Sequence, residues 1–171
     1  MNIAVPLQTI TVGVVVERSK SVSPWGDFLW RPLSALSGAP ATPPWTMLSD
    51  DGERATFFAG VTDIELHRTE AENYRGNLMS GAPLLWVVLR PSGVKMPYDL
   101  MLVTADPAEG EAMTEAGNDL VESVPMPQAI QQAVADFVAE HHVERAFSKR
   151  VRDHADPEAL GRRVPGDDEQ P

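Results

Sequence analysis

The stretch TITVGVVVE, residues 9–17, alternates polar and branched apolar side chains. Successive side chains of a strand point to opposite faces, so the apolar residues share one face of an extended segment. These residues are Ile10, Val12, Val14 and Val16. The stretch predicts a strand with one buried apolar face.

The next segments extend this β pattern. WGDFLWRPLSAL, residues 25–36, also alternates, but Pro32 lacks a backbone donor, which predicts an edge strand or a strand that ends there. GAPATPPW, residues 38–45, holds three prolines and predicts an extended surface loop, with a ligand of the PxxP type as the alternative.

Asp51-Gly52 lies between WTML and ERATFF and supplies the positive φ that a hairpin turn needs. Gly60 is expected to break the following run, after which Ile64 and Leu66 share the buried face of another strand. LLWVVLR, residues 84–90, is apolar on both faces and predicts a central strand. YDLMLVT, residues 98–104, is expected to pair with it antiparallel.

Three segments have helical patterns. Thr69 and Glu72 have the spacing of a capping box, which predicts a helix to about Leu78. Asp106-Pro107 predicts a second start, with a stop at Gly117. A third helix follows Pro127, and its apolar stripe consists of Ile130, Val134, Phe137, Val138 and His141.

Strands followed by helices, without β-α-β alternation, predict an α+β fold. We expect a largely antiparallel sheet curled as a barrel or half-barrel, with C-terminal helices packed on it. A β-sandwich plus helices is the alternative. Residues 1–154 are expected to form a single domain, and the acidic residues 155–171 a disordered tail.

Composition narrows the function classes. The chain has no cysteine, which excludes thiolate chemistry, disulfides and cysteine-ligated metals. Its start lacks a basic leader and no run is long enough to span a membrane, so a cytoplasmic protein is expected. The net charge of −11 makes binding to nucleic acid unfavourable over most of the surface.

The basic segment, residues 141–154, is the exception, because it carries four basic and two acidic residues. We predict that it docks a protein partner; the alternative is that it folds back onto the acidic body. A straight helix would change its buried face here, so the helix either breaks near His142 or runs off the sheet. The candidate partner-binding residues are His142, Arg145, Phe147, Lys149, Arg150 and Arg152.

The other candidate residues are His67, His141 and Trp86, which could line a pocket in a barrel rich in tryptophan. A buried core histidine is the alternative for His141. No catalytic motif and no HExxH-type spacing is present, so no catalytic residue, metal or cofactor is predicted.

Several segments together resemble a family of small proteobacterial proteins that form a domain of unknown function. They include PWGDFLWRPLSALSGAP, FFAGVTDIELHRTEAENYRGNL, MLVTADPAEGE and FVAEHHVERAFSKRVR. Genes of that family often lie beside those for formate dehydrogenase and molybdenum-cofactor handling. The resemblance implies an accessory role in the assembly or regulation of a molybdenum-dependent oxidoreductase. We therefore expect a non-enzymatic adaptor that binds a molybdoenzyme subunit or maturation factor; the alternative is a small-molecule-binding protein or enzyme with a barrel cavity lined by tryptophans.

Overall fold

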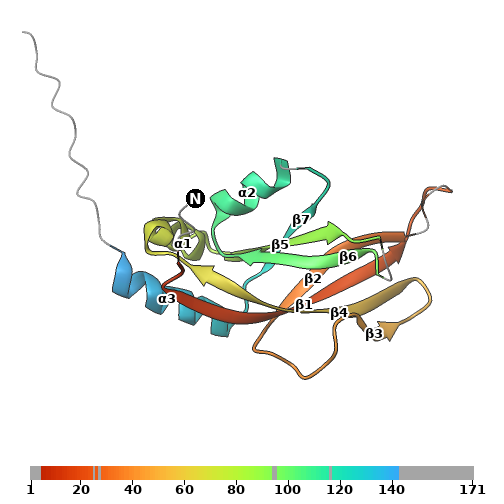
Figure 1. The fold of residues 1–171 in the computed structure, drawn as a ribbon, viewed down its shortest axis with the longest axis horizontal. Coiled ribbons are helices and arrows are strands. Elements are labelled where there is room, and N and C mark those ends of the chain that lie inside the picture. The colour runs from red at the N-terminus through yellow and green to blue at the C-terminus, as the bar shows by residue number, and fades with distance from the viewer. Residues whose placement is uncertain (1–4, 25, 27, 94–95, 116, 143–171) are drawn as a thin grey trace, which may run out of the picture.

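The computed structural model describes residues 5–142 except 25, 27, 94, 95 and 116 (Figure 1). Strands form most of the regular structure. In chain order the elements are β1 (Gln8–Lys20), β2 (Phe28–Ser37), β3 (Thr46–Asp50), β4 (Arg54–Leu66), a 3₁₀ turn (Arg68–Glu70), α1 (Ala71–Leu78), β5 (Leu84–Pro91), β6 (Tyr98–Thr104), α2 (Pro107–Glu115), β7 (Leu120–Pro125) and α3 (Gln128–His141).

β1 contains the alternating stretch and lies inside a four-stranded sheet of order β2-β1-β4-β3, in which every neighbouring pair is antiparallel. Val12, Val14 and Val16 have no exposed surface, which confirms the predicted buried face. β2 is an edge strand, as Pro32 indicated, and continues through that proline to Ser37.

β4 is longer than predicted, because Gly60 does not break it. Val14 pairs with Gly60 and Val15 with Phe58, so the intervening Ala59 is an extra residue in a β-bulge. Gly60 has φ of 131°, a conformation that glycine adopts without a Cβ clash. The glycine therefore bends the strand instead of ending it. The hairpin between β3 and β4 is confirmed, with Gly52 at φ 92°.

The remaining strands form a second antiparallel sheet of order β6-β5-β7. β5 lies in the middle and pairs with β6, as predicted. β7 was not predicted; it pairs with the other edge of β5, with Leu85 opposite Val124.

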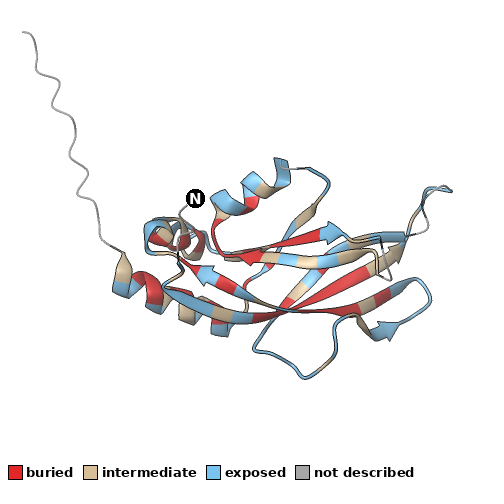
Figure 2. Ribbon diagram, in the orientation of Figure 1, coloured by how far each residue is buried: buried red, intermediate tan, exposed pale blue. Residues whose placement is uncertain are grey.

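The two sheets share one core, in which Leu85, Val87 and Leu89 of β5 pack with the apolar face of β1 (Figure 2). β6 lies next to β4, and β7 lies next to β2. The backbone pairing of the described strands nevertheless divides into two sheets. The α+β class and the antiparallel pairing are confirmed, whereas the described strands form two sheets and no closed barrel, so the predicted barrel or half-barrel is not confirmed.

The helices occupy two places. α1 and α3 lie together at the end of the sheets where β1 begins and β4 ends, and the rings of Tyr74 and Phe137 make an edge-to-face contact at 6.0 Å (Figure 1). α2 covers the outer face of the second sheet, so the helices do not all gather on one side. Among the described residues, no helix is long and apolar enough to cross a membrane.

The capping box predicted from Thr69 and Glu72 is wrong. The chain first forms the 3₁₀ turn, and the residue before α1 is Glu70, whose side chain caps no backbone N–H group. The Thr69 hydroxyl instead donates to the Glu70 carboxylate at 3.3 Å. α1 nevertheless ends at Leu78, where the sequence predicted its end.

Candidate functional site

The predicted docking segment begins where α3 ends. His142 leaves the helix with φ −75° and ψ 112°, so the helix breaks at the position where the sequence pattern changes face. Its backbone N–H still donates to the Val138 carbonyl at 2.8 Å. The other predicted docking residues, Arg145, Phe147, Lys149, Arg150 and Arg152, lie outside the described residues, and their role remains a prediction.

Of the three predicted pocket residues, His141 packs against Phe137 of its own helix α3, and Trp86 packs against α2. The His141 ring lies 4.5 Å from the Phe137 ring, and its side chain is 23% exposed. Trp86 alternates along β5 with the core residues and lies on the outer face of its sheet, against Gly110 of α2. Neither His141 nor Trp86 lines the hollow that His67 borders.

His67 borders a hollow of about 440 Å³, whose other lining residues are Thr69, Glu70, Asp106, Ala108 and Glu109. The carboxylates of this hollow have structural partners. Asp106 accepts from the Ala108 N–H at 2.9 Å and thereby caps α2. Glu109 accepts from the Thr104 hydroxyl at 2.6 Å. Asp106 and Glu109 therefore stabilise the start of α2 through these contacts.

Tyr74 belongs to the core and contacts His67, which borders this hollow. Its hydroxyl accepts from the His67 N–H at 3.0 Å. Burial raises the pKa of Tyr74 to about 12, and the nearby Asp106 and Glu109 carboxylates add to the rise. The phenol therefore stays neutral at physiological pH. Among the described residues, no three His, Asp or Glu side chains are grouped so that they could hold a metal ion.

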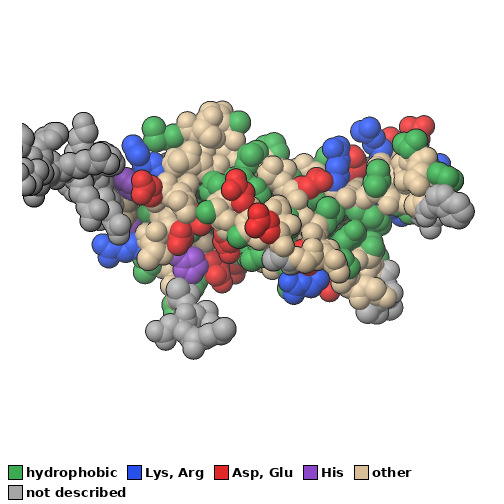
Figure 3. Space-filling view, turned by 90° about the horizontal axis from the view of Figure 1, so that it is seen from above, with side chains coloured by type: hydrophobic (Ala, Val, Ile, Leu, Met, Phe, Trp, Pro, Cys, Tyr) green, Lys and Arg blue, Asp and Glu red, His purple; other side chains and the backbone are tan. Residues whose placement is uncertain are grey.

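A different surface lies at the opposite end of the molecule, where β1 meets β2 and β3 meets β4 (Figure 1). Four of the seven Lys and Arg residues that the structure describes are located there, beside exposed apolar side chains. Figure 3 shows basic and hydrophobic groups together at this end. We call it the hairpin surface; it consists of Arg18, Lys20, Val22, Phe28, Leu29, Arg31 and Arg54.

The strand register explains why these residues meet. In the antiparallel sheet Arg18 is paired with Ala55, next to Arg54, and Glu17 is paired with Arg31. The apolar members are well exposed: Val22 completely, Phe28 by 45% and Leu29 by 58%. Arginine and aromatic residues at this exposure are typical of protein interfaces.

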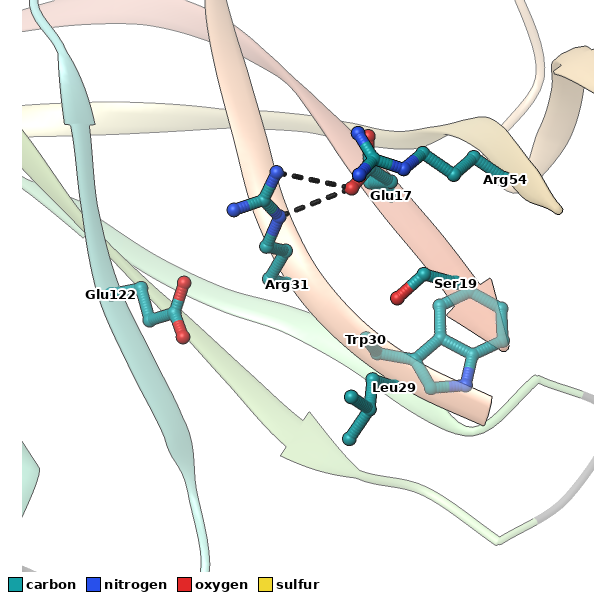
Figure 4. A pocket seen from close by; sticks show the side chains of 7 residues that line it. All are labelled: Glu17, Ser19, Leu29, Trp30, Arg31, Arg54 and Glu122. Carbon is teal, nitrogen blue, oxygen red and sulfur yellow. Dashed lines mark hydrogen bonds and ion pairs between the residues drawn. The ribbon is translucent and has the colours of Figure 1, made fainter. Parts of the chain in front are cut away.

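One side of the hairpin surface contains a hollow of about 370 Å³. Glu17 lines this hollow and is 7% exposed. Its Oε1 accepts from Nε and Nη2 of Arg31, both at 3.1 Å (Figure 4). Arg54 and Glu122 line the same hollow, and Glu122 projects from β7 toward the space beside Arg31. A buried carboxylate thus fixes one arginine of the surface.

On the other face of the same strand, Arg18 is held by aromatic rings. Its guanidinium carbon lies 4.4 Å from the ring centre of Phe28, 5.2 Å from that of Phe57 and 5.8 Å from that of Trp30. These distances are within the range of cation–π attraction. No carboxylate among the described residues forms an ion pair with Arg18.

The hairpin surface was missed from the sequence. Arg18, Arg31 and Arg54 are separated by 13 and 23 residues, so they form no local charge cluster. A usable signal was present, because Asp51-Gly52 predicts the hairpin that brings Arg54 to the end of β4. Pairing β1 antiparallel with both neighbours then gathers the three arginines at one end.

Comparison with known proteins assigns the chain to a family. No curated protein and no solved structure matches it. One family model, described as a protein of unknown function (DUF3305), matches residues 11–151, which include both hairpins and most of the basic segment. The chain belongs to this DUF3305 family.

Proposed function

We propose that this protein is a non-enzymatic adaptor that binds another protein through the hairpin surface. The observation that carries the proposal is the gathering of four basic residues beside exposed apolar side chains on a chain whose net charge is −11. Exposed Phe and Leu side chains next to arginines supply the anchors on which protein interfaces depend.

The contrast with the other hollow supports this choice. Around His67 the carboxylates cap α2 and bind neighbouring side chains. At the hairpin surface, by contrast, no carboxylate of the described residues forms an ion pair with Arg18, Lys20 or Arg54. Cations that form no ion pair with the described carboxylates favour binding to an acidic group of a partner.

The basic segment is a second element of the same proposal. The family match extends to residue 151, so it includes Arg145, Phe147, Lys149 and Arg150. We propose that this segment contributes a further contact; α3, which precedes it in the chain, lies at the opposite end of the molecule from the two hairpins (Figure 1).

For the partner we propose a subunit or maturation factor of a molybdenum-dependent formate dehydrogenase. The support is the resemblance to a family whose genes often lie beside those for that enzyme. An accessory role in a cytoplasmic assembly step fits a cysteine-free acidic domain.

Site-specific photo-crosslinking in cells grown on formate tests the proposal. A photoreactive amino acid replaces Leu29, which is 58% exposed on the hairpin surface. The matched control replaces Met79, which is 68% exposed at the end of α1, away from that surface. We expect Leu29 to capture one protein of the formate dehydrogenase system that Met79 does not capture.

Identical crosslinks from both positions, or none from Leu29, would contradict the docking surface. A single specific product outside the formate dehydrogenase system would retain the adaptor function and reject the proposed partner. Mass spectrometry of the crosslinked band distinguishes these results.

A further inference from the structure

We propose that Arg18 is the anchor of the hairpin surface and binds a carboxylate side chain from an acidic segment of the partner protein. The inference rests on the proposed function and adds the chemistry of the partner. We expect this segment of the partner to contain Asp or Glu next to apolar residues, because the exposed Phe28 lies beside Arg18.

The ring contacts prepare Arg18 for this role. Phe28, Trp30 and Phe57 limit the positions that the guanidinium can adopt, which reduces the conformational entropy lost on binding. A stacked guanidinium keeps the N–H groups at its edge available, and two of them match the oxygens of a carboxylate.

The other arginines show how such groups are satisfied within this protein. Arg90 donates from Nε and Nη2 to the two oxygens of Asp119, both at 3.1 Å. Arg31 donates to Glu17. Arg18 instead contacts aromatic rings, and no described carboxylate forms an ion pair with it.

The surrounding charge favours a peptide over a nucleic acid. Glu17 and Glu53 line the two hollows beside Arg54. Carboxylates at these positions repel the closely spaced phosphates of a nucleic acid. A peptide can place one carboxylate at Arg18 and apolar side chains on Phe28 and Val22, so it avoids that repulsion.

A library of random peptides displayed on phage provides the probe. The full-length wild-type protein is immobilised, and enriched peptides are synthesised and titrated against Arg18→Gln and Arg68→Gln variants. Arg68 is the matched control, because it is exposed in the 3₁₀ turn away from the hairpin surface and its substitution removes the same charge.

We expect enriched peptides to contain Asp or Glu beside apolar residues. Arg18→Gln should weaken their binding about tenfold or more, as loss of a charged hydrogen bond predicts. Arg68→Gln should leave binding unchanged. Arg18→Lys should give an intermediate affinity, because it retains the charge but loses the planar fork; it also tests the proposal if Arg18→Gln does not fold.

Peptides without acidic residues, or equal losses in Arg18→Gln and Arg68→Gln, would overturn the inference. So would a single-stranded oligonucleotide that binds the wild-type protein more tightly than the best peptide. If Leu29 crosslinks a partner but the enriched peptides lack carboxylates, the inference fails and the adaptor function stands. If no peptide is enriched and no partner is crosslinked, both fail.

Discussion

Gly110 of α2 lies directly against the indole ring of Trp86 on β5, so closely that a Cβ at this position would overlap the ring atoms. The contact holds α2 on the outer face of the second sheet. We expect Gly110→Ala to lower the free energy of unfolding by about 1–3 kcal/mol, as overpacking does. Urea unfolding followed by tryptophan fluorescence measures the change.

Gly76 is the matched control for that substitution, since it also lies within a helix but has open space around it. Gly76→Ala should raise the free energy of unfolding by up to about 1 kcal/mol through helix propensity. Equal effects at the two glycines would contradict the close contact with Trp86.

Tyr74 predicts a loss of stability at high pH. Its pKa is raised from the ordinary value of 10.0 to about 12, so the unfolded chain loses this proton before the folded protein does. The associated stability is fully present below pH 10 and disappears as pH rises to about 12. A shift of this size corresponds to roughly 2–3 kcal/mol.

Tyr74→Phe isolates this contribution. At neutral pH the variant should be less stable by about 1 kcal/mol, because the His67 N–H loses its acceptor. Its stability should then fall less steeply than that of the wild type between pH 10 and 12. Urea titrations at several pH values measure both curves, and parallel curves would rule out the raised pKa.

Asn77 joins α1 to both ends of the β5–β6 hairpin. Its amide nitrogen donates to the Leu84 carbonyl at 2.8 Å and the Ala105 carbonyl at 2.9 Å, and its oxygen accepts from the Leu84 N–H at 3.0 Å. Asn77→Ala should lower the free energy of unfolding by about 2–3 kcal/mol, because buried backbone groups lose their partners. Asn118→Ala, at an exposed loop position, should change it by less than about 0.5 kcal/mol.

Glu17→Gln should separate stability from binding at the hairpin surface. Arg31 is 54% exposed, so solvent screens its ion pair with Glu17 and the loss in stability should stay below about 1 kcal/mol. Acidic peptides should bind the variant more tightly, because a carboxylate beside Arg54 has been removed. Peptide titrations at low and high salt check this, and weaker binding at low salt would oppose it.

Much of the strand arrangement could be predicted, because half-buried strands carry their pattern locally. Val12, Val14 and Val16 alternate with residues of the other face, and Asp51-Gly52 marks its own turn. β7 could not be recognised in this way. It is an edge strand in which only Val124 is buried, so its pairing with β5 depends on the rest of the fold.

The sequence pattern does not distinguish a barrel from two separate sheets, for a related reason. Alternation shows which face of β1 is buried but not which strands lie next to β6 and β7. Likewise Arg18 and Arg31 become neighbours only through strand pairing, whereas Arg145 and Lys149 are close in sequence and form a recognisable local cluster. Sequence inspection therefore favoured a local charge cluster over one assembled by the sheet.

The separation of the end of α3 from the β1–β2 hairpin along the molecule has a practical consequence. α3 ends at the pole remote from the two hairpins, so a fluorophore or affinity handle attached near that end of the described chain lies away from them (Figure 1). Immobilisation by that route leaves Phe28 and Leu29 facing the solution. A handle attached ahead of Val5 departs from the same pole, because β1 begins there.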